Sequence, residues 1–415
     1  MASPSPRGRD GCALALIVTV LVVLLGAPAS AALPSELPAD TYQVNGKVRS
    51  VVVVGSTVWV GGVFSEVQTG KNVKVADVLN LAALHRTSGV PAAATPLPLG
   101  GVDGAEVWKL AASGTTVYAA GRFTLTIDGK TYSNLVAFDG ATGSVRPGFH
   151  PVGVPPRQAI TVSGGVVYTG GSSLSAFDAS TGAPVPGFST STVQVNASLR
   201  GHKIAAQFRE LLLFDGWLYA ACQCDSITQG GTTRAVTALI RFSPATGVHD
   251  RSFVAEGIGA SAFGVSVATD GSDIYLGAGG SDFVARYAPG TSHGSGLVGA
   301  QVWKRDTSGS AQAVAVSYGD VIVGGHFVEI ADETGDNCGF RSSTDPTKLD
   351  PDDVCISRNR LASYTLDGTL QPWDPGVTGN YNGVWALALD GTSIHVGGEF
   401  RRVHDVRQTY YARLD

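Results

Sequence analysis

Polar side chains of different chemistry stand at one repeated position of this chain. The position follows two small residues, usually Gly-Gly, and is occupied by Arg122, Gln223, His326 and Glu399 in four of the copies. A variable residue on a constant frame is typical of a ligand site, because rims and loops carry function while the frame packs. Partly exposed rim positions also vary without any ligand. We predict that these four residues contact a ligand.

Two tryptophans, Trp108 and Trp385, stand where the preceding strand of their copies begins. An aromatic ring there could stack on a sugar ring, or it could plug the centre of the fold as part of the core. We place both at the rim of the same candidate site, with the two roles left open.

Catalysis would need an acid and a base that converge, and the candidates are Arg122, Glu210, His326 and Glu399. His326 and Glu399 are metal ligands by type, but two side chains are too few for a site. The acidic stretch 332–353 could hold calcium, or it could simply be solvated. We assign no catalytic residue, no metal site and no cofactor, with calcium in the 332–353 loop as the alternative.

These residues are positioned by a phrase that the chain repeats seven times, about 47 to 73 residues apart. Each copy is an apolar run, a tight turn and a returning run that ends in aromatic-X-Gly-Gly-X-Phe. A β-rich period of this length is typical of a propeller blade. We predict an all-β fold, a seven-bladed β-propeller of four-stranded antiparallel blades. The copies stand at Trp59–Phe64, Tyr118–Phe123, Tyr168–Ser172, Tyr219–Cys224, Tyr275–Ala278, Ile322–Phe327 and His395–Phe400.

The last copy stops after its third strand, and Thr41–Val44 reads as a spare strand ahead of the first copy. We predict that Thr41–Val44 pairs with Tyr410–Leu414, which would close the ring and hide an open edge. The predicted organisation is a signal peptide (1–31), an N-terminal segment supplying a closing strand (32–47) and a propeller of seven repeats (48–415).

One face of this propeller is the better candidate for a site. The first strand of each copy should line the central channel and the second should run back beside it, so the polar rim positions share one face. On the other face, repeated Asp-X-X-Thr-Gly turns use their polar groups on their own backbone. We expect a ligand on the first face.

The phrases VWALALDGTSIHVGGEF and VYAAGRFTLTIDGKTYSNLVAFDG resemble the delta-60 repeat family of secreted bacterial β-propeller proteins. The resemblance covers nearly all of the chain after residue 31. It implies the propeller fold and export, and little about activity, because the family is mostly uncharacterised. Members often carry immunoglobulin-like or PKD modules after the propeller, and we expect none in this chain.

The N-terminal segment indicates export. Arg7 and Arg9 precede the apolar run Ala13–Leu25, and Ala29–Ala31 is a small-residue cleavage site. This is the pattern of a secretory signal peptide, with an apolar run too short for a membrane span. We predict a secreted, extracellular protein with no membrane span in the mature chain.

An even number of cysteines, four, follows the predicted signal peptide. In an exported chain this suggests disulfides. We predict that Cys338 and Cys355 are bonded and close a long polar insertion. Cys222 and Cys224 could be bonded to each other or could remain buried thiols.

The formal net charge is −5, and only 15% of the residues are charged. The chain shows no basic stripe, so no nucleic-acid partner is expected. Because no strong catalytic motif is present, we predict a non-enzymatic binding module at or outside the cell surface, a monomer with a protein or glycan partner. The alternative is an extracellular enzyme, a glycan-active hydrolase or lyase or a quinoprotein-like oxidoreductase, with its site at the channel mouth.

Overall fold

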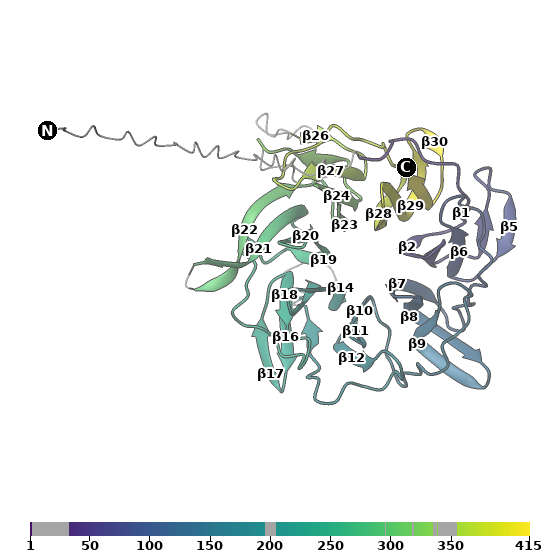
Figure 1. The fold of residues 1–415 in the computed structure, drawn as a ribbon, viewed down its shortest axis with the longest axis horizontal. Coiled ribbons are helices and arrows are strands. Elements are labelled where there is room, and N and C mark those ends of the chain that lie inside the picture. Colours follow the sequence, from purple (N-terminus) through teal and green to yellow (C-terminus); the bar gives the residue numbers. More distant parts are fainter. Residues whose placement is uncertain (2–32, 196–204, 295, 318, 335–337, 339–354) are drawn as a thin grey trace. The chain divides into compact units, whose positions relative to one another are not determined.

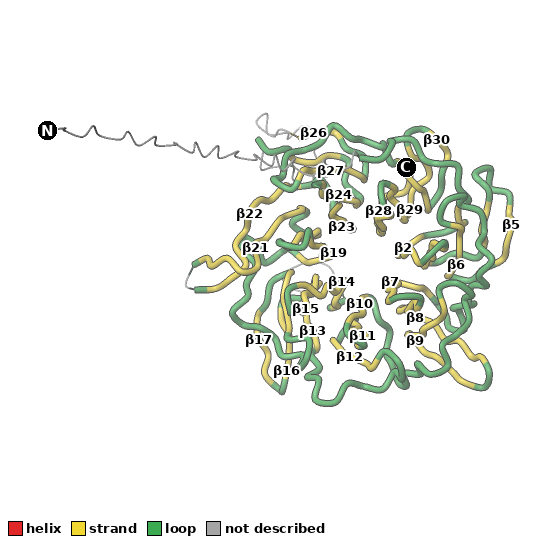
Figure 2. The backbone as a smooth tube through the Cα atoms, viewed as in Figure 1, coloured by secondary structure: helices red, strands yellow, loops and turns green. Residues whose placement is uncertain are grey.

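The structure, a computed structural model, describes Met1 and residues 33–195, 205–294, 296–317, 319–334, 338 and 355–415. The predicted signal peptide after Met1 and most of the predicted calcium loop lie outside the described residues. Every regular element in the described ranges is a β-strand, in agreement with the all-β prediction (Figure 2). No helix in these ranges is long and apolar enough to cross a membrane.

Seven antiparallel sheets, each built from the main strands of one repeat, follow one another in the described part of the chain, and three shorter sheets lie beside them. The first four are β2 (Val48–Val54), β3 (Thr57–Gly62) and β6 (Leu81–His85); β7 (Glu106–Ser113), β8 (Thr116–Ile127) and β9 (Lys130–Asp139); β10 (Ala159–Ser163), β11 (Val166–Gly170) and β12 (Leu174–Asp178); and β14 (Gln207–Phe214), β15 (Trp217–Gln223) and β18 (Leu239–Phe242). The last three are β19 (Phe263–Thr269), β20 (Ile274–Gly279), β21 (Phe283–His293) and β22 (Leu297–Asp306); β23 (Ala311–Ser317), β24 (Asp320–Gly325) and β27 (Leu361–Thr365); and β28 (Thr378–Asp390), β29 (Ser393–Val403) and β31 (Tyr411–Leu414), with β30 (Val406–Arg407) on β29.

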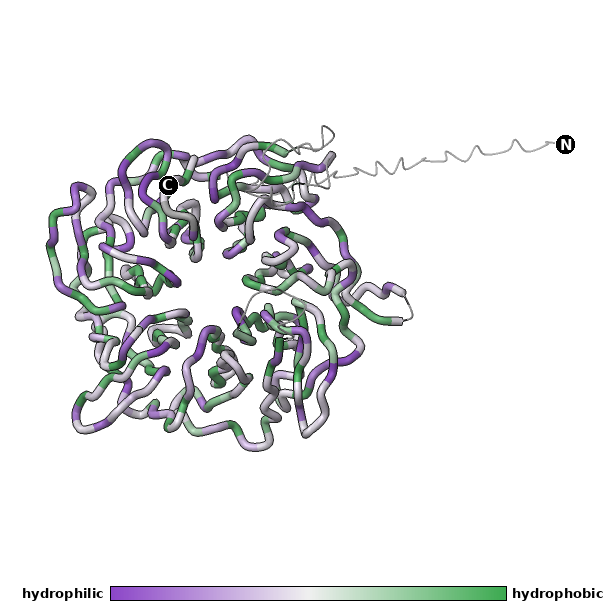
Figure 3. The backbone as a smooth tube through the Cα atoms, turned by 180° about the vertical axis from the view of Figure 1, so that it is seen from behind, coloured by the Kyte–Doolittle hydropathy of each residue, from purple (hydrophilic) through white to green (hydrophobic). Residues whose placement is uncertain are grey.

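The first strands of these sheets form a closed inner circle. Each contacts the first strand of the next sheet, in the order β2, β7, β10, β14, β19, β23 and β28, and β28 contacts β2. Figure 1 shows these strands around a common centre, with the later strands of each sheet farther out. In Figure 3 hydrophobic stretches lie within the sheets, and hydrophilic stretches are common in the connections at the periphery. This radial arrangement of sheets is that of a β-propeller.

The predicted fourth strand is regular in the fifth sheet, as β22, but not in the other six described sheets. In five of those, the chain after the third strand touches it through one isolated antiparallel bridge, such as Leu84 to Pro91 and Phe177 to Pro184. Proline has no N–H to donate to a ladder, which limits pairing at these outer edges. The predicted fourth strand of these five sheets is therefore represented by a single bridge, and four-stranded blades remain a prediction.

The predicted pairing of Thr41–Val44 with Tyr410–Leu414 is wrong. The last strand instead accepts residues 35–39: the N–H of Ser35 donates to Asp415 O (2.7 Å), and the N–H of Ala39 donates to Arg413 O (2.8 Å). Residues 43 and 44 form β1 (Gln43–Val44), which pairs with β4 in the first repeat. Val44 is buried in a cluster that contains Val67 of the first repeat and Tyr411 of the last sheet.

Several connections that were expected to be loops are short sheets. Three of them contain strands that lie between the second and third strands of a repeat: β4 (Glu66–Gln68) with β5 (Lys74–Asp77), β16 (Ser226–Gln229) with β17 (Thr232–Ala235), and β25 (Glu329–Ala331) with β26 (Cys355–Ser357). In the first two, a strand that precedes the repeat also pairs: β1 with β4, and β13 (Thr192–Gln194) with β16. They extend the repeats toward one end of the ring.

Both pairs of cysteines in the described residues are disulfide-bonded. Cys338 is joined to Cys355, the pairing that the sequence predicted. Cys222 is joined to Cys224, with a Cα–Cα distance of 5.3 Å, which resolves the alternative left open for these two residues. The bridge at 222 and 224 is buried at the end of β15.

The aromatic residue of the repeated phrase ties neighbouring sheets together. Trp59 Nε1 donates to Gly140 O (3.0 Å), and the hydroxyls of Tyr118 and Tyr168 donate to Ala179 O (3.2 Å) and Pro244 O (3.1 Å). Each acceptor lies in the turn that follows the third strand of the next sheet. The ring is buried, and its N–H or O–H group donates a hydrogen bond. This accounts for the choice of Trp or Tyr, rather than Phe, at this position.

Candidate functional site

Six of the seven described inner strands contain a β-bulge at the same place, near their first residues. In each, one extra residue interrupts the register with the second strand, and in a bulge the extra side chain is re-aimed relative to its neighbours. The extra residues are Arg49, Trp108, Arg209, Val265, Gln312 and Trp385. In the third sheet Gln158 directly precedes β10 and bonds through its N–H to Gly170 O (2.7 Å).

All seven of these side chains line one cavity of about 320 Å³, together with Glu106 and Lys109. Because each lining residue comes from the start of an inner strand, the cavity lies at one end of the inner circle. The volume is at the lower end of the range for ligand pockets, which suits a small molecule or one residue of a polymer.

The Gly-Gly pair of the repeated phrase makes this arrangement possible. A Cβ at Gly62 would lie 2.0 Å from Lys47 O, and a Cβ at Gly121 or Gly325 would lie 2.1 or 2.2 Å from a backbone oxygen of its own inner strand. The second small residue therefore lets the strand with the bulge approach closely. The frame is conserved between the copies because it holds the bulges, and the bulged side chains are free to differ.

Two ion pairs between sheets lie at the cavity. Arg49 Nε donates to Glu106 Oε1 at 2.6 Å, and Lys109 Nζ donates to Glu210 Oε1 at 2.6 Å. Glu210 Oε2 also accepts the backbone N–H of Val267 at 3.1 Å. Both carboxylates are thus held by cations, and the four side chains are about four-fifths buried.

Arg209 has no such carboxylate partner. Among the described residues its guanidinium makes one hydrogen bond, from Nη1 to the amide oxygen of Gln158 at 3.3 Å. Burial, with a further contribution from the Arg49 cation, lowers the pKa of Arg209 to about 10. Arg209 is therefore protonated at neutral pH. The Glu210 and Glu106 charges favour its charged form, but neither carboxylate forms a hydrogen bond with it.

Trp385 lies beside both arginines. Its ring centroid is 4.3 Å from the Arg49 guanidinium carbon and 5.8 Å from that of Arg209, distances typical of cation–π contacts. Its indole N–H is buried and has no hydrogen-bond partner in the described part of the chain. The Trp385 ring therefore helps to hold two cations at the cavity. This role differs from the two that the sequence left open, stacking on a sugar ring and packing in the core. Trp108 lines the same cavity.

Two predicted rim residues, His326 and Glu399, are connected through a buried amide. The Gln312 oxygen accepts from His326 Nδ1 (3.0 Å), and the Gln312 nitrogen donates to Asn382 O (2.7 Å). Asn382 Nδ2 in turn donates to Glu399 Oε2 (2.7 Å), which also lies 3.2 Å from Lys47 Nζ. Burial lowers the pKa of His326. The structure thus links these residues indirectly and does not place them together as metal ligands.

The other two predicted rim residues are separate from this network. Gln223 is buried and donates from Nε2 to Ala205 O at 3.1 Å. Arg122 is exposed near the middle of β8, opposite Glu106 in the strand register. Neither lines the cavity. No group of three or more His, Cys, Asp or Glu side chains suited to a metal occurs among the described residues.

Sequence reasoning missed two cavity residues because it assumed unbroken alternation. The bulges put Arg209 and Gln312 at the cavity, and not the residues that follow them, Glu210 and Ala313. The position of the second small residue on the partner strand was the available signal, since it lies opposite the residue just before each bulge.

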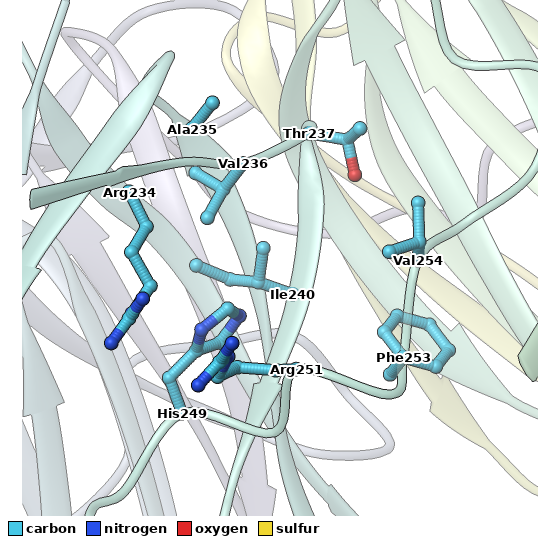
Figure 4. Close-up of a pocket in the computed structure, with 9 residues that line it drawn as sticks. All are labelled: Arg234, Ala235, Val236, Thr237, Ile240, His249, Arg251, Phe253 and Val254. Atoms are coloured by element: carbon cyan, nitrogen blue, oxygen red, sulfur yellow. The ribbon is translucent and has the colours of Figure 1, made fainter. Parts of the chain in front are cut away.

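A second hollow, of about 420 Å³, lies away from the inner strands (Figure 4). Arg234 of β17 lies on one side of it with His249 and Arg251, and Phe253 lies across from them. Burial lowers the pKa of His249, whose Nδ1 has no hydrogen-bond partner in the ranges described. The hollow is lined by residues outside the repeated positions, and we assign it no function.

No family model and no curated protein matches the chain. Solved structures with similar folds include the computationally designed Ika8 protein (12% identity, TM-score 0.47, 91% of this chain and 92% of that chain), BamB from Moraxella catarrhalis (13%, 0.44, 89% and 83%) and the WD40 β-propeller domain of Doa1 (10%, 0.47, 91% and 96%). Similarities at this level carry no inference about the activity of this chain.

Proposed function

We propose that this protein is a secreted, non-enzymatic binding module, a seven-bladed β-propeller that engages a protein or glycan partner through the cavity at one end of its inner circle. The observation that carries this proposal is the convergence of the bulged side chains. Six inner strands use the same backbone irregularity to aim side chains of four kinds (Arg, Trp, Val and Gln) at one cavity, while the frame around them repeats. Bulges commonly re-aim side chains at functional sites.

The blade count in this proposal is supported by the circle of inner strands, in which β28 returns to β2. Closure is supported by the hydrogen bonds from Ser35 and Ala39 to the last strand. Export and membership of the delta-60 repeat family are also part of the proposal. Two disulfides are compatible with an oxidising compartment outside the cytosol.

Binding is favoured over catalysis by the state of the carboxylates at the cavity. Glu106 is paired with Arg49, and Glu210 is paired with Lys109 and also accepts a backbone N–H. A general acid or base needs a carboxyl or imidazole free to exchange a proton with a substrate. Of the remaining candidates, His326 uses both ring nitrogens in contacts within the protein, and Glu399 contacts Asn382 and Lys47.

The test is a binding screen of the secreted chain on a glycan array and by thermal shift against soluble metabolites, repeated with two variants. Trp108→Ala opens one wall of the cavity, and Arg234→Ala changes the peripheral hollow as a matched control. We expect a hit whose binding is lost in Trp108→Ala and kept in Arg234→Ala. A hit that Trp108→Ala binds as well as the parent would overturn the proposal, and so would chemical conversion of the hit by the parent protein.

A further inference from the structure

The cavity carries more positive than negative charge. Arg49, Lys109 and Arg209 are its cations, and the carboxylates within hydrogen-bond reach of them are Glu106 and Glu210. Three cations against two carboxylates leave one positive charge, in a protein whose net charge is −5. The excess therefore belongs to this site and does not follow from the composition.

Arginine donors face the cavity without a protein acceptor. Arg209 uses Nη1 for Gln158, and Arg49 uses Nε for Glu106; no further hydrogen bond is made by either guanidinium within the described residues. Their remaining nitrogens are not among the buried groups that lack a partner, so solvent can reach them. Accessible guanidinium donors in a partly buried cavity are suited to a planar, bidentate oxyanion.

The two guanidinium groups are close enough to disfavour one another. Both lie over or beside the Trp385 ring, and the Arg49 charge contributes to the lowered pKa of Arg209. Like charges in a partly buried site destabilise each other, and an anion bound between them would relieve that repulsion. The ring keeps both cations facing the cavity in the absence of such an anion.

We propose, building on the proposed function, that the cavity binds its ligand through a carboxylate group that the Arg209 guanidinium receives. A single carboxylate matches the single excess charge, and the small volume restricts the bound part to one sugar acid or one acidic side chain. Trp108 offers an aromatic face, and the Gln158 amide offers hydrogen-bonding groups, to the rest of the bound sugar or side chain.

The experiment compares pairs of small probes that differ in one carboxylate. D-glucuronate is measured against D-glucose, and N-acetyl-aspartate amide against N-acetyl-asparagine amide, by calorimetric titration of the secreted chain. We expect at least one acid to bind roughly tenfold tighter than its neutral counterpart, as a charge-assisted bidentate contact allows. The pair that shows the difference identifies the source as a glycan or a peptide. Inorganic phosphate is expected to bind more weakly than that acid.

Variants assign the effect to Arg209. Arg209→Gln should remove most of the preference for the acid, and Arg209→Lys, which keeps the charge and loses the planar fork, should retain part of it. Arg251→Gln removes an equal charge from the peripheral hollow and should bind as the parent does. Melting curves of all three verify folding, and Arg209→Lys carries the test if Arg209→Gln does not fold.

Three results would overturn the inference: acids that bind no tighter than their neutral partners, equal losses in Arg209→Gln and Arg251→Gln, or phosphate that binds tighter than both acids. If a neutral ligand binds and its binding depends on Trp108 but not on Arg209, the proposed function stands and the inference of a carboxylate ligand is refuted. An acid that binds independently of both residues would remove both proposals.

Discussion

Gly397 of β29 lies directly against Val48 of β2. A Cβ at position 397 would come within 2.4 Å of Val48 Cγ1 and 3.2 Å of Val51 Cγ2. The same relationship joins other neighbours, since a Cβ at Gly61 would lie 2.6 Å from Val107 Cγ1 and one at Gly324 would lie 2.5 Å from Val384 Cγ1. The first glycine of the repeated pair therefore sets the contact between sheets, and the last sheet packs on the first as any sheet packs on the next.

Substitution of Gly397 is expected to weaken this contact. Gly397→Ala should lower the free energy of unfolding by about 1–3 kcal/mol, because Val48 is β-branched and stiff and the sheets must shift apart. Gly70→Ala, at a position where a Cβ would meet nothing within 4 Å, should change it by less than about 0.5 kcal/mol. Urea unfolding measures both.

The contact is tested more directly by a double-mutant cycle. Val48→Ala alone should destabilise through lost burial, but combined with Gly397→Ala it makes room for the new Cβ. We expect the two changes to cost less together than their separate costs predict. Simple additivity would show that the sheets do not meet at these residues.

Loss of the Cys338–Cys355 disulfide should destabilise the chain. The bridge spans 17 positions, and loop entropy gives a contribution of about 3 kcal/mol for a loop of this size. The Cys338→Ser/Cys355→Ser variant should unfold at lower denaturant concentration than the parent. Thiol titration of the unfolded, unreduced parent should find no thiol from residues 222, 224, 338 and 355, and two or more free thiols among them would contradict the pairing.

Stability is expected to fall as the pH is lowered from about 7 to 5. Burial lowers the pKa of His395, although Asp390 opposes the shift, and His395 Nδ1 contacts the Tyr411 hydroxyl at 2.8 Å. The unfolded chain takes up a proton near the ordinary histidine pKa of about 6.5, which the folded chain resists, so acid favours unfolding in this window. Burial shifts the pKa of His249 and His326 in the same direction.

Melting temperatures between pH 5 and 8 test this dependence. His395→Gln keeps a polar group near Tyr411 but cannot titrate, so its melting temperature should vary less with pH than that of the parent. His85→Gln, at an exposed position, serves as the control and should keep the parent's pH dependence. An unchanged slope in His395→Gln would rule out His395 as a source of the effect.

The rim residues remain a separate prediction. Arg122→Ala combined with Glu399→Ala should weaken partner binding while the melting temperature stays nearly constant. Arg122 is exposed, and the contact between Glu399 and Lys47 is a partly exposed ion pair, which contributes about 0–1 kcal/mol. The test is to measure, for the double variant and the parent, both the affinity for the partner found on the array and the melting temperature. A variant that unfolds would show that these side chains serve stability.

The sequence by itself determined the number of repeats, the all-β class and the places where strands meet. These follow from local chemistry: Gly-Gly where backbones approach, an aromatic with a donor where sheets are tied together, and Asp-X-X-Thr-Gly where Asp139 and Asp178 accept from their own turns. It also predicted the Cys338–Cys355 bridge, because the two cysteines flank a long polar insertion that a crosslink would order.

Only the tertiary structure decided which side chains face the cavity. A bulge inserts one residue and changes which face each neighbour occupies. The second small residue of the repeated phrase marks its neighbourhood, but the pairing with the partner strand shows which residue is the extra one. For that reason Arg209 and Gln312, rather than Glu210 and Ala313, line the cavity. The same holds for the chain start, where residues 35–39 form backbone hydrogen bonds with the last strand and residues 43 and 44 pair with β4, because so short a strand pattern fits either place.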